Sequence, residues 1–530
     1  YDYRVITGTL LIILLYTIYS YIRCRQTGPD YWQKQGVKSV QVSLWSKFTK
    51  KWSDLELDLY RQNGRLFGVH ELQRPVLFVG EPELIRDILV KDFHIFNARR
   101  DFRTGSNPLF DNQLTFVDYH DWQRIRYAMS PTFSTGKLRG MMPMIRDCVH
   151  RMDRNLRKIA DNGVDDSDLK LVFGAYSMEV ICQVAFGVRV DALNDPTNPL
   201  IACSRRIFRR KFNPKAIIIF LMPVLAKVFK YTFIDDDVSD VFQQFARKLI
   251  DERQQQNSMT TITADGAGKR LDFLQIMLDS TDDSVVKLTA KDIEEDIGED
   301  LKSENNSEKY REFDGKFEKK ITTDELVSQC MLFLLAAYET TASTVSFILY
   351  NLANNPECQQ KLYNEIADYY RQHADLDYDS LNSLNYLDAV IKETKRYNSV
   401  ALFLERTASQ DYTTRPLTGG GTGIRIRKGD LVHIPLYAIH RDPDHFADPD
   451  QFKPDRFMPG NLNHHPYAYL PFGAGPRACI GRRLALMELK MAVQHAVYNY
   501  RFFPSNKPIE YTFGGAQIVP KEIYLRVEKR

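Results

Sequence analysis

Long helices and a smaller set of strands are predicted from three stretches of this sequence. Apolar residues recur at helical spacing from Thr322 to Asn354, and about 30 residues at a rise of 1.5 Å reach about 50 Å. A second helical pattern starts directly after Gly481. Residues 75–80, PVLFVG, instead indicate a strand of a small sheet, and a helix is expected from Pro82 to Lys91. The helices therefore account for more of the chain than the sheet does.

Composition favours one large folded unit. The chain has 530 residues, 44% of them hydrophobic, and no Gly/Ser-rich or Pro-rich linker divides it. The formal net charge of +3 gives no indication of nucleic-acid binding. Seven scattered cysteines favour reduced thiols in a protein facing the cytosol over a disulfide framework.

The first apolar stretch predicts a membrane anchor within residues 1–28. Val5–Ile22 is nearly uninterrupted apolar sequence, close to the minimum length of a membrane-spanning helix. Arg23 and Arg25 follow it, which places the rest of the chain, residues 29–530, on the cytosolic side. A cleaved signal peptide is the alternative, but no basic segment precedes the stretch and no small-residue cleavage site follows it.

Two internal segments stand apart in composition. Residues 282–320 are charged and lack apolar periodicity, so we expect a flexible insertion there. Ala216–Leu225 is strongly apolar but too short to span a bilayer, and it follows a basic run at residues 205–211. Buried core and a segment resting on the membrane surface both remain open for it.

The stretch Pro471–Gly481, PFGAGPRACIG, combines one cysteine with several glycines and an arginine. Cys479 lies just before a predicted helix, where the macrodipole and free N–H groups favour a thiolate. Gly473 and Gly475 permit close approach of the backbone to a flat ligand, and Arg477 suits a carboxylate. A sulfur ligand for the iron and an arginine for a propionate together predict a haem-binding site. The alternative is that Cys479 is only a small buried hydrophobic residue. A zinc site or a disulfide is not predicted, because no second cysteine lies nearby in the sequence.

The pattern Phe472-x-x-Gly475-x-Arg477-x-Cys479-x-Gly481 resembles, at every fixed position, the haem-thiolate signature of the cytochrome P450 superfamily. The resemblance covers nearly the whole chain after the anchor, and LVFGAYSMEVICQVAFGV is similar to the branch with the family 3 cytochromes and thromboxane synthase. It implies a mostly α fold with a minor β-sheet region, in one haem-thiolate domain over residues 29–530. It also implies haem b as cofactor, with Cys479 as the axial ligand of the iron and Phe472, Gly475 and Arg477 among the haem-binding residues.

The resemblance further implies residues that bind the haem propionates. Trp122 and Arg126 are spaced i, i+4 on one helix face and match the family's Trp-x-x-x-Arg helix, whereas a surface cation–π pair is the alternative. Arg406 matches a propionate-binding arginine beside a substrate pocket lined by Val400–Leu404. Arg99 is a further candidate.

Glu339 and Thr340 lie in the middle of the apolar helix that starts near Thr322, where buried polar groups need partners. The resemblance to the family's Ala/Gly-Gly-x-Asp/Glu-Thr pattern implies catalytic roles, in which the Thr340 hydroxyl hydrogen-bonds the oxygen being activated and Glu339 relays protons through water. The alternative is that Thr340 and Thr341 only bond to carbonyls one turn earlier. Ala337 stands where the family usually has glycine, so a narrower oxygen groove is expected.

Glu393 and Arg396 are i, i+3 neighbours that in isolation would be an ordinary surface pair. Together with Arg456 in the later PDRF stretch, they match the Glu-x-x-Arg element of the same family. The resemblance implies a buried structural cluster that holds the Cys479 loop in place. Ser399 replaces a proline that is common after this element, so we expect a looser turn.

As a whole, the resemblance implies a monooxygenase anchored in the endoplasmic reticulum membrane and facing the cytosol. It would insert one oxygen atom from O₂ into a lipophilic small molecule, such as a xenobiotic, steroid or fatty acid. Electrons would come from NADPH through a separate NADPH–cytochrome P450 reductase, with cytochrome b5 as a further partner, because the chain has no G-x-G-x-x-G fingerprint after a strand. Two explanations fit a further group of basic residues equally well: a docking face for such an acidic partner, or ordinary solvated charge. These residues are Lys137, Arg139, Arg482, Arg483 and Lys490.

Two other functions remain open. A haem-thiolate isomerase would rearrange a lipid peroxide, as thromboxane synthase does, but the presence of Thr340 argues against it because such a rearrangement needs no proton relay. A non-enzymatic haem-binding sensor is the second alternative.

Overall fold

The computed structural model describes residues 28–530 except 29, 43–50, 72–73, 164, 193, 196, 209–214, 216–217, 220–222, 261–271, 282–319, 374, 417–422 and 515–516. The predicted anchor and the predicted insertion at 282–320 therefore lie outside the described residues, apart from Gly28 and Lys320. Ala216–Leu225 is described only in part.

Helices make up most of the described chain, as predicted. The α-helices are α3 (Trp52–Asn63), α4 (Pro82–Arg86), α5 (Pro108–Asp111), α6 (Tyr119–Met129), α7 (Thr135–Asn162), α8 (Leu169–Phe186), α9 (Pro199–Phe208), α11 (Pro223–Val228), α12 (Asp236–Thr260), α13 (Phe273–Asp279), α15 (Thr323–Asn354), α16 (Pro356–Gln372), α17 (Tyr378–Ser383), α18 (Asn385–Tyr397), α19 (Leu436–Ile439) and α20 (Arg482–Asn499). A π-helical turn, η2 (Asp87–Lys91), continues α4, and short 3₁₀ turns are η1 (Gln33–Gln35), η3 (Ser130–Phe133), η6 (Pro454–Phe457) and η7 (Pro466–Ala468).

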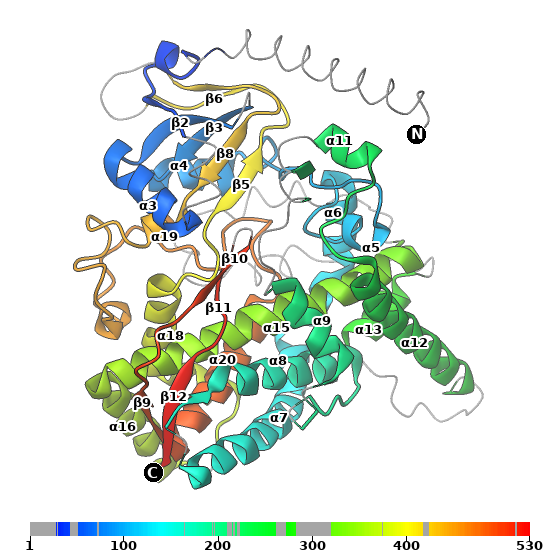
Figure 1. Cartoon of the computed structure of the whole chain (residues 1–530), viewed down its shortest axis with the longest axis vertical. Coiled ribbons are helices and arrows are strands. Elements are labelled where there is room, and N and C mark those ends of the chain that lie inside the picture. Colours follow the sequence, from blue (N-terminus) through cyan, green and yellow to red (C-terminus); the bar gives the residue numbers. More distant parts are fainter. Residues whose placement is uncertain are drawn as a thin grey trace.

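The strands form one five-stranded sheet and three smaller ones. The larger sheet has the order β1 (Ser39–Val40), β2 (Leu66–Glu71), β3 (Arg74–Val79), β8 (Leu431–Ile434) and β5 (Leu404–Thr407). The others pair β4 (Ser167–Asp168), β12 (Tyr524–Lys529) and β9 (Tyr500–Pro504); β10 (Tyr511–Gly514) and β11 (Gln517–Pro520); and β6 (Tyr412–Thr413) and β7 (Arg425–Ile426). Figure 1 shows the larger sheet at one end of the molecule.

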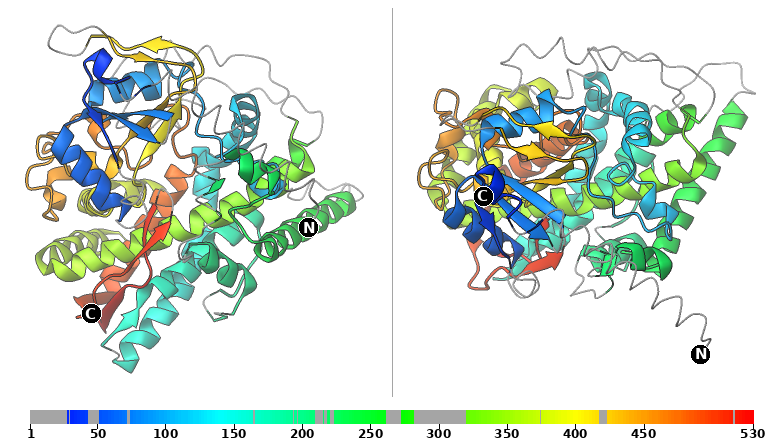
Figure 2. Two further views of the ribbon diagram at one scale, coloured as in Figure 1. Left: turned by 45° about the horizontal axis from the view of Figure 1, so that its top comes forward. Right: turned by 90° about the horizontal axis from the view of Figure 1, so that it is seen from above.

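The core is divided in the same way. One large apolar cluster lies between the helices and contains most buried residues of α7, α8, α15 and α20. A second cluster lies beneath the larger sheet and includes residues of α4, η2, β8 and α19. Figure 2 shows from two further directions that the sheet lies to one side of the helical part. The Cys479 loop, Pro471–Gly481, connects the two parts, because Ala474 belongs to the second cluster and α20, which follows the loop, packs in the first.

The helix α15 runs across the helical part (Figure 1) and packs against α8, α18 and α20. Its predicted start is confirmed, because the Thr322 hydroxyl accepts from the Glu325 backbone N–H at 3.2 Å and the Glu325 carboxylate accepts from the Thr322 N–H at 2.8 Å. The helices α8 and α15 are long and apolar enough to cross a membrane, but both are mostly buried within the protein. They are core helices of the folded body.

We expect Thr322→Ala to lower the free energy of unfolding by about 1 kcal/mol, because the first turn of α15 loses its side-chain acceptor. Thr323→Ala is the matched control, since Thr323 is the first residue inside the same helix and makes no cap. Urea unfolding of both variants measures the difference, and equal losses would contradict the role of the capping box.

Candidate active site

The Cys479 loop is a tight turn that ends where α20 begins. The backbone N–H of Cys479 donates to the Phe472 carbonyl at 2.9 Å, and Gly473 and Gly475 have positive φ angles of 74° and 72°. As predicted, Cys479 precedes a helix, which starts at Arg482. Its side chain is exposed and forms no disulfide, whereas Cys148, Cys182, Cys330 and Cys358 are buried. Cys203 is partly exposed, and Cys479 is the most exposed of the six cysteines among the described residues.

Gly475 is needed for a reason that the sequence did not reveal. A Cβ at this position would lie 2.0 Å from the Leu89 carbonyl oxygen of η2, whereas a Cβ at Gly473 would make only ordinary contacts, the nearest at 3.7 Å to the Leu404 side chain. We expected both glycines to admit a flat ligand. The structure shows in addition that Gly475 allows the loop to pack directly on the backbone of η2.

Four arginines from separate segments lie at this site, one of them within the Cys479 loop itself. Arg126 of α6 donates to the Ala478 carbonyl at 2.9 Å, and Arg477 donates through Nε to the Asn97 carbonyl at 2.6 Å. Arg99 donates to the Arg477 carbonyl at 3.5 Å. Arg406 lies on β5. The β-bridge between Ala98 and Thr407 places this strand beside the residue before Arg99, so Arg406 belongs to the same group of arginines.

Trp122 lies on the same face of α6 as Arg126, but its cationic partner is Arg477. The guanidinium carbon of Arg477 is 4.4 Å from the Trp122 ring centroid, and both side chains are buried. The cation–π contact weighed as an alternative therefore exists, although between other residues and in the interior rather than on the surface. The Trp122 ring packs against the Arg477 guanidinium and orients it.

Three of these arginines, Arg99, Arg406 and Arg477, form no ion pair with any carboxylate of the described residues. Burial is the main cause that lowers the pKa of Arg477 to about 8, followed by the positive charges of Arg99 and Arg406. Burial likewise lowers the pKa of Arg406 to about 9, followed by Arg99. Nε of Arg406 and Nη2 of Arg477 are buried without a hydrogen-bond partner. Such uncompensated charge requires an anion, and the two carboxylates of a haem beside an accessible thiol fit this requirement.

The Glu393, Arg396 and Arg456 side chains form the predicted buried cluster. Arg396 of α18 donates to both Glu393 oxygens at 2.8 and 2.9 Å and to the carbonyls of His440 and Pro449 at 2.8 Å each. Arg456 of η6 lies 3.2 Å from the Glu393 carboxylate. The cluster thus joins α18 to the segment that leads into the Cys479 loop.

The expected looser turn at Ser399 is a hydrogen-bonded link. Its hydroxyl lies 2.6 Å from Nδ1 of His440, and Nε2 of that ring accepts from the Leu470 backbone N–H at 3.1 Å. Since Nε2 accepts, Nδ1 carries the proton and donates to Ser399. The end of α18 is therefore connected to the residue that precedes the Cys479 loop.

Glu339 and Thr340 have different partners on α15. The Thr340 hydroxyl donates to the Ala336 carbonyl at 2.7 Å, which is the bond that our alternative described. Glu339 is buried, forms an ion pair with Lys170 of α8, and accepts from the Ser343 hydroxyl at 2.9 Å. No pattern in the sequence indicates the pairing of Glu339 with Lys170, because the two residues lie far apart in the chain.

The carbonyl of Ala337 also has a partner from outside α15. The Ser177 hydroxyl lies 3.0 Å from this carbonyl and 2.9 Å from the Glu488 carboxyl group. The Ser177 hydroxyl can donate to either of these oxygens, and burial raises the pKa of Glu488 to about 8. These contacts join α20, α8 and α15 at the turn before Glu339.

The basic residues proposed as a docking face do not act as one group. Lys490 is buried and lies 3.2 Å from Asp388, so it does not belong to a surface. Arg139 is exposed but pairs with Asp379 at 2.8 Å. Arg483 donates to the Thr135 hydroxyl at 2.6 Å.

Comparisons with known proteins identify the family of the chain. The family described as Cytochrome P450 matches residues 40–302 and 303–527. The chain is 34% identical to Cytochrome P450 3A7 of Homo sapiens over 495 residues, which cover 91% of this chain and 88% of that protein. It is 35% identical to Cytochrome P450 3A6 of Oryctolagus cuniculus over 455 residues, 85% of this chain and 81% of that protein.

A mostly helical fold with a small sheet and an arginine-lined thiol loop define a haem protein. The chain belongs to the cytochrome P450 family. The predicted fold class is confirmed, and the protein is a monooxygenase of the oxidoreductase class.

We expect Gly475→Ala to reduce haem content and thermal stability far more than Gly473→Ala. Both substitutions place a side chain at a positive φ, which costs about 1–2 kcal/mol, but only the Gly475 variant drives a Cβ against the Leu89 carbonyl. Haem absorbance per protein and the thermal midpoint measure the effect. Similar losses in the two variants would show that loop packing on η2 is unimportant.

Proposed function

We propose that Cys479 is the axial thiolate ligand of haem b and that the protein inserts one oxygen atom from O₂ into lipophilic small molecules. Electrons come from NADPH through a separate NADPH–cytochrome P450 reductase, with cytochrome b5 as a second donor. The observation that carries the proposal is the accessible Cys479 thiol, bordered by Arg99, Arg406 and Arg477 without carboxylate partners.

The chain's own residues bind and orient the cofactor. When bound, a thiolate-ligated haem supplies oxygen activation, which electron donation from sulfur assists. Arg406 and Arg477 bind its carboxylates through the guanidinium nitrogens that have no hydrogen-bond partner among the described residues. Trp122 fixes the orientation of Arg477. The Glu393 cluster holds the loop that carries Cys479, so its loss reduces haem uptake before it affects chemistry.

Proton delivery is assigned to Thr340 and Glu339. The Thr340 hydroxyl donates to Ala336 and keeps its lone pairs available to accept from a water molecule. Glu339 contacts Lys170 and Ser343 through the same oxygen, Oε1, and its other oxygen, Oε2, exchanges a proton with water beside Thr340. Lys170 is accordingly a positioning residue for this carboxylate.

An aromatic cluster supports lipophilic substrates. Phe110 stacks on Phe116 with ring centroids 4.2 Å apart and lies 5.4 Å from Phe233, and Phe102 lies 5.9 Å from Phe233. Phe102, Phe110 and Phe116 come from the segment between η2 and α6, and Phe233 comes from the segment before α12. Xenobiotics, steroids and fatty acids all match an aromatic lining.

We place the protein at the endoplasmic reticulum membrane, with residues 1–28 as its anchor and residues 29–530 facing the cytosol.

The proposal is tested by NADPH-dependent oxygen uptake of the purified protein with added reductase and a lipophilic substrate identified by spectral titration. We expect uptake with the wild type, and Thr340→Ala should keep NADPH consumption while product per NADPH falls several-fold, because proton delivery is impaired. Thr344→Ala is the matched control, since Thr344 makes the same type of bond, to the Thr340 carbonyl at 2.7 Å.

Different outcomes exclude different parts of the proposal. Conversion of a lipid peroxide without NADPH or oxygen uptake would support the isomerase. Absence of any turnover with haem bound would support the sensor. Unchanged coupling in Thr340→Ala would remove Thr340 from proton delivery.

A further inference from the structure

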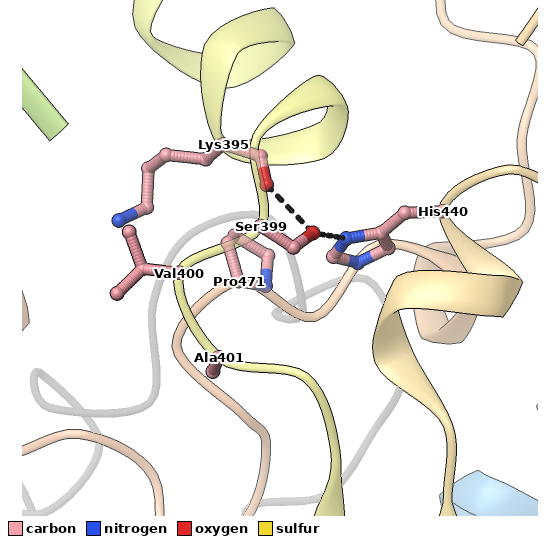
Figure 3. A pocket seen from close by; sticks show the side chains of 6 residues that line it. All are labelled: Lys395, Ser399, Val400, Ala401, His440 and Pro471. Carbon is pink, nitrogen blue, oxygen red and sulfur yellow. Dashed lines mark hydrogen bonds between the residues drawn. The ribbon is translucent and has the colours of Figure 1, made fainter. Parts of the chain in front are cut away.

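Lys395 is a cation of α18 that the Glu393 cluster does not use. It lies between Glu393 and Arg396 in sequence, but its ammonium nitrogen is 3.8 Å from the centroid of the Phe472 ring in the Cys479 loop. Figure 3 shows that its side chain leaves the helix on the side opposite His440, while its carbonyl accepts from the Ser399 hydroxyl at 3.0 Å. The side chain therefore faces the loop rather than the cluster.

No carboxylate of the described residues pairs with this ammonium group. The only anion that raises its pKa is the Cys479 thiolate, while burial, the main cause, and Arg482 lower the pKa to about 8. Lysine side chains are ordinarily protonated at pH 7. The neighbouring Lys392 differs, because its ammonium pairs with Asp388 at 3.0 Å.

The surroundings of Lys395 do not supply a counter-charge either. A cavity of about 20 Å³ adjoins it and is lined by Lys395, Ser399, Val400, Ala401, His440 and Pro471. This volume holds about one water molecule, and no acidic side chain lines it. The Phe472 ring offers a cation–π contact, which attracts the ammonium group but does not neutralise it.

We propose that Lys395 raises the reduction potential of the haem by placing an unneutralised positive charge beside the Cys479 thiolate. The inference rests on the proposed thiolate ligation. Reduction of the ferric haem adds one electron and no proton at Lys395, so the haem–thiolate unit gains one negative charge. A nearby fixed cation favours that gain, and in a partly desolvated site it does so more strongly than in water. Lys395 acts on the iron through its electric field, so it is a positioning residue and not a catalytic residue.

The test is the one-electron reduction potential of the purified holoprotein at pH 7, without substrate, by spectroelectrochemistry. We expect Lys395→Met to lower the equilibrium constant for reduction about tenfold, which corresponds to a potential lower by about 59 mV. Lys395→Arg should remain close to wild type because it keeps the charge. Lys392→Met is the matched control on the same helix and should have no effect.

Electron paramagnetic resonance of the ferric proteins separates this inference from the proposed function. An unchanged potential in Lys395→Met with a thiolate-type spectrum would overturn the role of Lys395 and leave Cys479 as the ligand. A wild-type spectrum without thiolate ligation would overturn both. Lys395→Gln replaces Lys395→Met if the latter does not take up haem, and an equal shift in Lys392→Met would also contradict the inference.

Discussion

Positive charge gathered inside the protein without protein carboxylates is the constraint on which the rest of the structure depends. Arg406 and Arg477 are buried, each has a nitrogen without a hydrogen-bond partner, and Arg99 adds a third charge beside them. An isolated buried charge is strongly unfavourable, and leaving one partner of a buried pair absent costs several kcal/mol. The arrangement is therefore complete only with an anionic ligand, and the haem of this family carries two carboxylates.

The scaffold around these charges fixes where the thiol lies. The loop of Cys479 is held on one side by the contact of Gly475 with the backbone of η2. On the other side, the Ser399–His440–Leu470 hydrogen bonds connect it to the end of α18. Both supports act on the backbone of the loop, so the position of the sulfur depends on tertiary packing and not on the conformation of the loop alone.

Local signals explain which features could be predicted from the sequence. The start of α15 at Thr322, the helix after Gly481 and the strand near residues 75–79 all follow from caps, periodicity and composition within one segment. The resemblance supplied the arginines, whose grouping needs four segments to meet. The partners of Glu339 and the burial of Lys490 depend on contacts between distant helices, for which a single sequence holds no pattern. The position of Lys395 beside the Cys479 loop has no signal in the sequence, because Glu393 and Arg396 by themselves account for the motif that contains it.

The position of the Soret band in the ferrous carbon monoxide complex tests the central claim most directly, because it reports the ligand opposite the gas. We expect the purified wild type to show the band typical of a cysteine thiolate ligand, and Cys479→His to shift it to the position typical of a histidine ligand. A histidine-type band in the wild type, or a thiolate-type band that survives in Cys479→His, would contradict the account.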